Sequence, residues 1–149
     1  MTIYFAADHA GFTLKNELLG YVANDLGYEV EDCGAYEYDE GDDYPAFIRK
    51  AAEAVGEDPK GRKAIVLGGS GSGEAIAANK LPGVRAALYY GGNLDIVRLS
   101  REHNDANVLS LGARFISLGD AKEAVKLWLS TDFTGEERHV RRIAAIEPG

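Results

Sequence analysis

The feature of the sequence most able to support chemistry is a glycine-rich segment, GGSGSGE, at residues 68–74. Its glycines let the backbone approach a ligand closely and turn N–H groups toward it. The segment follows an apolar run and precedes a helical pattern, and helix N-termini favour anions. It lacks the lysine that follows the last glycine of a Walker A loop. It also lacks the G-x-G-x-x-G spacing of a dinucleotide-binding loop. It is therefore either a ligand cradle of another kind or a tight strand-to-helix turn.

Glu74 is the one carboxylate of this segment, and it is expected in the first turn of the following helix. A carboxylate at the mouth of a sheet could act as a general base, or it could simply balance the helix dipole. Burial would raise its pKa and the dipole would lower it. The sequence does not decide between these two effects.

Two other positions place polar groups at the ends of expected elements. Asp8 and His9 follow the first apolar run, where they could bind substrate hydroxyls or phosphate. Asp8 could equally cap the next helix. His103 lies in REHND (101–105) at the end of a helical pattern, and a histidine among charged neighbours is usually a surface residue.

A basic cluster lies near the C-terminus. Arg138 and Arg142 are four residues apart and share a helix face, as do His139 and Arg142 at three residues apart. Such a face suits a phosphate dianion, because arginine offers forked donors. The alternative is a solvated helix end, where cations also suit the dipole.

Apolar runs typical of strands alternate with helical patterns. Strands are predicted at 2–7, 28–33, 63–67, 84–90 and 107–111, and helices at 13–26, 44–55, 72–79, 94–102, 120–129 and 136–146. This alternation predicts one Rossmann-like, three-layer α/β domain over residues 1–149, with a five-stranded parallel sheet and helices on both faces. Ligands of such sheets lie outside the C-terminal strand ends, where the strand order reverses.

The composition of the chain excludes several classes of function. The 149 residues suit one domain, and the net charge of −8 argues against nucleic-acid or anionic-membrane binding. The single cysteine, Cys33, excludes an intrachain disulfide. No signal peptide and no apolar run of ~18 residues is visible, so we expect a cytoplasmic protein. No spacing typical of a metal site is visible either, and we expect no metal and no cofactor.

Six segments resemble the type B ribose-5-phosphate isomerases, in the wider group that includes the galactose-6-phosphate isomerase subunits. They are AADHAGFTLK (6–15), DYP (43–45), GGSGSGEAIAANK (68–80), PGVRAAL (82–88), REHNDANVLSLGAR (101–114) and RHVRRI (138–143). The resemblance covers nearly the whole chain. It implies a homodimer or a dimer of dimers with the sites at the subunit interface.

The resemblance also implies which residue moves the proton. In many members a cysteine just before the glycine-rich loop is the base, but Gly68 stands at that place here. A second branch lacks the cysteine, carries GGSGxGE and uses its glutamate as the base. Glu74 matches that glutamate.

The other roles follow by position from the resemblance. Ser70 matches a residue that polarises the reacting oxygens, Asp8 one that binds sugar hydroxyls, and His103 the acid/base that opens the sugar ring. The substrate-binding residues would be the backbone donors Gly69, Gly71 and Gly73, the phosphate set His9, Arg138, His139 and Arg142, and Tyr44, Asn104 and Arg114. The partner subunit would contribute His103 and Asn104.

The order of the elements gives an independent reason for a shared site. His103 is expected at the far end of the helix after the fourth strand, so it should point away from its own strand-end face. It could serve that face only across a two-fold interface. Leu94, Val97 and Leu99 are predicted to form part of this interface.

The implied reaction interconverts ribose 5-phosphate and ribulose 5-phosphate through a cis-enediolate. Two alternatives stay open: an isomerase of another phosphorylated sugar, either a tetrulose phosphate or a 6-phosphohexose, and a non-catalytic sugar-phosphate-binding module. Glu74 argues against the module, since a carboxylate beside an anionic ligand would repel it. Residues 89–95 match the family least well and could reshape the sugar pocket.

Overall fold

A five-stranded parallel sheet forms the centre of the computed structural model, which describes residues 1–147. The strands are β1 (Thr2–Ala7), β2 (Glu29–Asp32), β3 (Arg62–Gly68), β4 (Ala86–Tyr89) and β5 (Val108–Gly112), in the spatial order β2-β1-β3-β5-β4. Every neighbouring pair runs parallel. The predicted five-stranded parallel sheet is confirmed.

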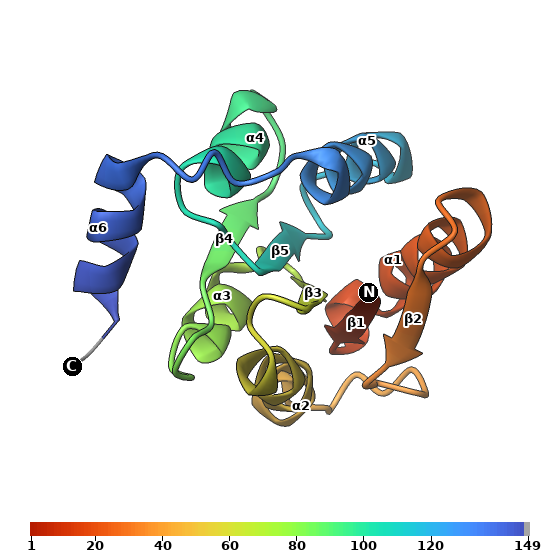
Figure 1. Cartoon of the computed structure of the whole chain (residues 1–149). Coiled ribbons are helices and arrows are strands. Elements are labelled where there is room, and N and C mark those ends of the chain that lie inside the picture. Colours follow the sequence, from red (N-terminus) through yellow and green to blue (C-terminus); the bar gives the residue numbers. More distant parts are fainter. Residues whose placement is uncertain (148–149) are drawn as a thin grey trace.

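Helices cover both faces of the sheet (Figure 1). They are α1 (Phe12–Gly20), α2 (Tyr44–Glu57), α3 (Ser72–Ala78), α4 (Asp95–Glu102), α5 (Leu118–Ser130) and α6 (Glu137–Ile146). Side chains alternate along β1 because successive strand residues point to opposite faces. Ile3 and Phe5 pack in a core with Trp128 of α5, whereas Tyr4 and Ala6 pack in a core with Ile48 of α2. The expected three layers are confirmed, and no helix of residues 1–147 is long and apolar enough to cross a membrane.

Every helix differs from its predicted range, and all but the first differ by only one or two residues at an end. The helix expected over 13–26 is α1 followed by a π-helical turn, Tyr21–Asp25. α5 begins before the expected residue, Asp120. The side chain of Ser117 caps it by accepting a hydrogen bond of 3.1 Å from the backbone N–H of Asp120.

The strand order reverses between β1 and β3. β1 leads outward to β2 on one side, and β3 leads toward β5 and β4 on the other, so the segments after β1 and β3 face one crevice. Gly11 shows how closely these segments pack, because a methyl group at Gly11 would lie 2.7 Å from Cβ of Leu67. The fold therefore brings residues 8–11 and the glycine-rich turn together.

Buried Lys15 anchors the chain after β2. Its ammonium donates to both carboxylate oxygens of Asp32, at 2.8 and 2.9 Å, and to the carbonyl of Ala35 at 2.8 Å. These three acceptors match the three donors of an ammonium group, which explains why a lysine can be fully buried here. The start of the long loop between β2 and α2 is fixed as a result.

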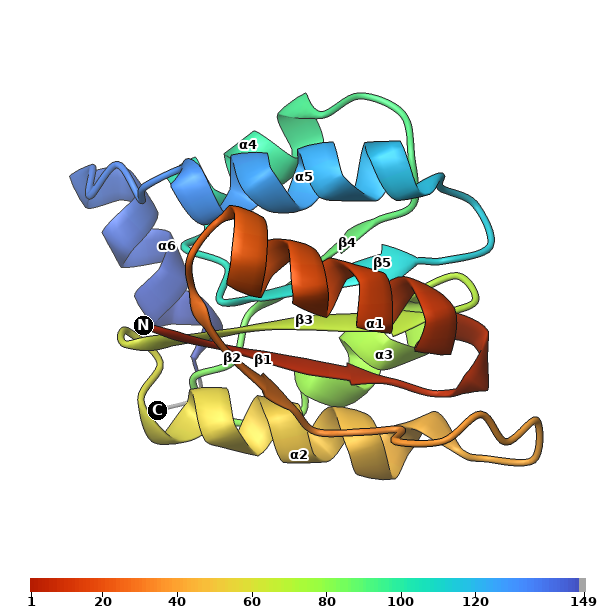
Figure 2. The same cartoon turned by 90° about the vertical axis from the view of Figure 1, so that its right-hand side faces the viewer.

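α6 stands to one side of the sheet, beyond the edge strand β4 (Figure 1). In Figure 2 the strands run toward the right, and α6 lies at the left, near the end where they begin. Glu147, just after α6, accepts a hydrogen bond of 3.0 Å from Arg85. α6 is thus tied to the body at its end, and much of its surface faces solvent.

Candidate active site

The glycine-rich turn after β3 directs carbonyl groups toward β5. The carbonyl of Gly69 accepts from the N–H of Arg114 at 3.0 Å, and that of Gly71 accepts from the hydroxyl of Ser110 at 2.7 Å. Gly71 has a φ of 81°, which favours glycine. Within residues 1–147, the backbone N–H groups of 69–71 donate to no protein acceptor. These groups are available to an anionic ligand.

The carboxylate of Glu74 occupies the space where a side chain at position 68 would lie. A methyl group at Gly68 would overlap the carboxylate, and Glu74 is only 4% exposed. Burial raises the pKa of Glu74. A hydrogen bond from its own backbone N–H opposes that rise, and the charge of Asp8 adds to it. The effect of burial on the pKa of Glu74 is therefore larger than the opposing effect of the helix N-terminus. A carboxylate with a raised pKa is suited to proton transfer near neutral pH.

Asp8 lies at the end of β1, on the same side of the sheet. Its Oδ1 accepts a hydrogen bond of 3.0 Å from the N–H of Ala10, so the capping role considered for it is present. It is also buried and near enough to Glu74 to influence its pKa. Capping leaves the second oxygen of Asp8 for another partner.

Asp42 belongs to this group and was missed by the sequence analysis. Its Oδ1 accepts from the backbone N–H of His9 at 3.0 Å and is 2.8 Å from Nδ1 of the His9 ring. This hydrogen bond is the main cause of a raised pKa of His9. Asp8 also raises it, and Arg114 lowers it. No signal pointed to Asp42, because it lies in an acidic loop that is typical of solvated surface.

The ligand atoms of Asp8, His9 and Asp42 lie within 4.8 Å of one another, as in many metal sites. Spacing along the sequence could not reveal this cluster, since Asp42 is far from the other two. The hydrogen bond between His9 and Asp42 accounts for the arrangement, and a nitrogen that donates a proton has no lone pair for a metal. We assign no metal to this cluster.

Tyr44 and Arg114 flank the glycine-rich turn. The hydroxyl of Tyr44 lies 2.5 Å from the place where a methyl group at Gly73 would be, and Nη1 of Arg114 lies 3.1 Å from the corresponding place at Gly69. A cavity of about 660 Å³, lined in part by His9 and Tyr44, opens beside them. One end of the sheet thus carries Asp8, His9, Tyr44, Gly69, Ser70, Gly71, Gly73, Glu74 and Arg114.

The other expected residues gather near the N-terminal strand ends. The rings of His103 and His139 stack with their centroids 4.2 Å apart. Burial, together with the nearby His103 and Arg138, lowers the pKa of His139. Arg138 and Arg142 are exposed on α6. Asn104 follows His103 in the same group.

The two groups do not meet within one chain. Asn104 precedes β5, and the contact between Arg114 and Gly69 follows it, so the groups lie at opposite ends of a strand. Five strand residues span roughly 16 Å. In Figure 2, α6 lies near the end where the strands begin, and the turn between β3 and α3 lies at the other end.

The apolar surface of α4 differs from the predicted one. Val97 is 1% exposed and Leu94 packs against the core, so both face their own sheet. The prediction that Val97 lines an interface was therefore wrong. Leu94 and Leu99 are half-buried, and an interface role for them stays a prediction. Ile96 is the exposed apolar residue of α4, at 58%.

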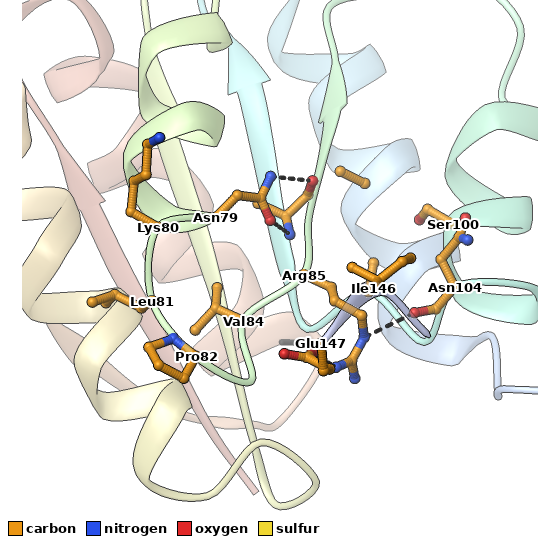
Figure 3. Close-up of a pocket in the computed structure, with 13 residues that line it drawn as sticks. Asn79, Lys80, Leu81, Pro82, Val84, Arg85, Ser100, Asn104, Ile146 and Glu147 are labelled. Atoms are coloured by element: carbon orange, nitrogen blue, oxygen red, sulfur yellow. Dashed lines mark hydrogen bonds and ion pairs between the residues drawn. The ribbon is translucent and has the colours of Figure 1, made fainter. Parts of the chain in front are cut away.

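A separate hollow of about 470 Å³ lies at the end that carries Asn104 (Figure 3). Its walls are residues 79–82 and 84–87, together with Ser100, Asn104, Ala106, Ile146 and Glu147. Arg85 crosses it, donating from Nε to the carbonyl of Asn104 at 3.0 Å and from Nη1 to Glu147 at 3.0 Å. This hollow therefore belongs to the second group of residues and not to Glu74.

The chain is similar to proteins of known family along nearly its whole length. The family model described as Ribose/Galactose Isomerase matches residues 3–146. Ribose-5-phosphate isomerase B of Mycobacterium tuberculosis is 44% identical over 143 residues, which cover 96% of this chain and 86% of that protein.

Solved structures are similar to the chain as well. Ribose-5-phosphate isomerase B of Clostridium thermocellum is 44% identical with a TM-score of 0.90, covering 98% of this chain and 95% of that one. The enzyme of Mycoplasma genitalium, with bound ribulose-5-phosphate, is 36% identical with a TM-score of 0.91, covering 97% and 93%.

Proposed function

The chain belongs to the ribose/galactose isomerase family, and we propose that it interconverts ribose 5-phosphate and ribulose 5-phosphate. The observation that carries this proposal is the buried carboxylate of Glu74 beside Gly68, next to backbone N–H groups without protein acceptors. In the proposal, residues 1–149 act as one isomerase domain.

Glu74 is the proposed base. It removes the proton from C2 of the opened aldose and returns a proton to C1, so that one group serves both transfers. The intermediate cis-enediolate carries negative charge on oxygen, and oriented donors stabilise such charge as it develops. The N–H groups of residues 69–71 supply these donors, and Ser70 adds a hydroxyl. No cofactor is required by this chemistry.

Binding and ring opening use the remaining groups. Asp8 accepts from sugar hydroxyls, and Tyr44 lines the pocket. His103 opens the sugar ring, assisted by Asn104. His9, Arg138, His139 and Arg142 surround the phosphate, and Arg114 is a further substrate-binding residue of the site. Because His103 and the α6 residues lie a strand length away from Glu74 in their own chain, a partner subunit must provide them.

Exposed apolar residues support this homodimer. Ile76 on α3, Ile96 on α4 and Ile146 on α6 are each about 60% exposed, at 60%, 58% and 63%. Ile146 lines the hollow of Figure 3, and the helices that carry the other two, α3 and α4, pack against the edge strand β4. Exposed apolar side chains gathered on one side of a protein mark association surfaces. In a two-fold dimer the same surface would serve both subunits.

Subunit exchange tests the shared site. Glu74→Gln and His103→Ala subunits are each expected to be inactive, and after exchange a mixed dimer regains one intact site. Half the dimers in a statistical mixture are mixed and each has one of two sites, so activity should reach about a quarter of the parent value. No recovery after demonstrated exchange would mean that each site is built from one chain.

The substrate itself is tested with a panel of four-, five- and six-carbon sugar phosphates, assayed for aldose–ketose interconversion. Ribose 5-phosphate should give the highest kcat/KM. A clear preference for a tetrulose phosphate or a 6-phosphohexose would replace the substrate but keep the chemistry. Binding without turnover of any sugar would favour a non-catalytic module. With ribose 5-phosphate as substrate, we place the protein in the pentose phosphate pathway of the cytoplasm.

A further inference from the structure

The carboxylate of Asp42 has an unusual relation to His9. One oxygen, Oδ1, accepts from two donors of the same residue, the backbone N–H at 3.0 Å and the ring at 2.8 Å. The side chain of Asp42 is 9% exposed, and its other oxygen, Oδ2, is buried without a hydrogen-bond partner among residues 1–147. Such a carboxylate is costly to bury unless a positive charge lies beside it.

From this geometry we propose that Asp42 is a positioning residue that fixes the tautomer and the positive charge of His9 for binding the substrate phosphate. Nδ1 carries the proton donated to Asp42, so Nε2 is the ring nitrogen left to bind a ligand. When His9 is charged, Nε2–H donates to a phosphate oxygen. The inference rests on the proposed function only in taking a sugar phosphate as the ligand.

The other groups around His9 fit this role. Asp8 Oδ2 lies 3.9 Å from Nδ1 and also favours the charged ring, while the charge of Arg114 opposes it. The ring of Tyr38 meets that of His9 edge-on, with the ring centroids 6.4 Å apart. Two carboxylates against one guanidinium keep His9 protonated to higher pH than an isolated histidine, in accord with its raised pKa.

The loop that carries Asp42 is held in place from both ends. Asp42 donates its own N–H to the carbonyl of Asp39 at 3.0 Å, and Lys15 fixes the beginning of the loop through Asp32 and Ala35. α2 begins two residues after Asp42. The carboxylate is therefore positioned by the fold and needs no ligand to bring it to His9.

Substitutions of Asp42 separate geometry from charge. Asp42→Asn keeps an acceptor oxygen but removes the charge, whereas Asp42→Ala removes both. Glu37→Gln is the matched control, since Glu37 is an exposed carboxylate of the same loop. The chain has three histidines, so labelled histidine followed by NMR resolves each ring.

We expect the pH midpoint of His9 to fall in both Asp42 variants and to stay unchanged in Glu37→Gln. The neutral ring should keep its proton on Nδ1 in Asp42→Asn and lose this preference in Asp42→Ala. An unchanged midpoint in Asp42→Asn, which needs no repacking, would overturn the proposal. This readout does not depend on turnover, so it stands or falls separately from the proposed function.

Kinetics then links His9 to the phosphate. Between pH 7 and 9 the substrate phosphate is a dianion, because its second pKa is about 6. At a pH between the His9 midpoints measured in the parent and in Asp42→Asn, the KM of Asp42→Asn for ribose 5-phosphate should be roughly three- to tenfold higher than that of the parent. Its kcat should be nearly unchanged, and its rise in KM should begin at a lower pH than in the parent. A KM equal to that of Glu37→Gln at every pH would overturn the role in substrate binding.

Discussion

The two ends of the sheet carry the two halves of the proposed site in different ways. At the C-terminal end, Glu74 is 4% exposed, and the carbonyls of the glycine-rich turn are bonded to β5. At the other end, Arg138 and Arg142 are exposed on α6, which stands beyond the edge of the sheet. The first half is built into the fold, and the arginines of the second are presented outward.

The difference matches what each half must do. Proton transfer and charge stabilisation depend on donors and a base fixed within fractions of an ångström. Binding a phosphate by long arginine side chains tolerates a less rigid support, because the groups act through charge and forked donors. Changes at Glu74 and the glycine-rich turn should therefore lower kcat, and changes of the arginines on α6 should raise KM.

Of the substitutions that test this difference, Glu74→Gln should have the largest effect on activity. Glutamine has nearly the same shape but cannot accept the C2 proton, so kcat should fall about 10²-fold or more while KM changes little. Exchange of the C2 proton with solvent should be lost in parallel. Glu123→Gln, an exposed glutamate of α5, is the control and should keep parent activity.

The pH profile of the parent gives a second check on Glu74. Its ionised form is the base, and burial raises its pKa above the ordinary value of 4.5. Activity should therefore be lost as pH falls through that raised pKa, at a higher pH than for an ordinary glutamate. An acid limb of kcat/KM at pH 4.5 or below would contradict this assignment.

Gly68→Ala should have the next largest effect. The added methyl group would overlap the carboxylate of Glu74, and a displacement of about 1 Å can cost roughly 10²-fold in rate. We expect kcat to fall at least tenfold in a folded protein. Gly20→Ala is the control, because a methyl group at Gly20 meets nothing within 4 Å. Equal activities of the two variants would show that Glu74 need not occupy this space.

Arg142→Ala tests the role of the exposed arginines on α6 in binding the phosphate. Losing a charged donor to the phosphate should raise KM about tenfold and leave kcat within a few-fold. Arg141→Ala is the matched control on the same helix, since Arg141 pairs with Glu137 at 2.8 Å. A fall in kcat for Arg142→Ala without a change in KM would break the division between the two ends.

The sequence could predict the sheet because local patterns determine it. Buried runs such as 2–7 and 63–67 are typical of parallel strands, and alternating helices imply crossovers. The helix start at Leu118 was missed since the cap, Ser117, lies before the apolar pattern. The apolar face of α4 was misassigned because the direction of Val97 depends on how the helix rests on the sheet.

The residues of the candidate site were likewise predictable only where they are close together in the sequence. Glycines and Glu74 are adjacent in the sequence, so their chemistry could be inferred from spacing. The balance between burial and helix dipole at Glu74 could not, because burial depends on residues that pack from elsewhere in the chain. Asp42 was invisible for a similar reason: its partner, His9, is 33 residues away. Contacts between loops depend on tertiary structure and carry no local pattern.

The smallest effect is expected from modifying Cys33. Its side chain is 3% exposed, and burial raises the pKa of its thiol to about 11. At pH 8 about one thiol in a thousand is then ionised, and the thiolate is the reactive form. Iodoacetamide should therefore leave activity unchanged in the native protein, while the same reagent should modify one thiol per chain in denaturant. Inactivation that substrate prevents would show that Cys33, and not only Glu74, serves the reaction.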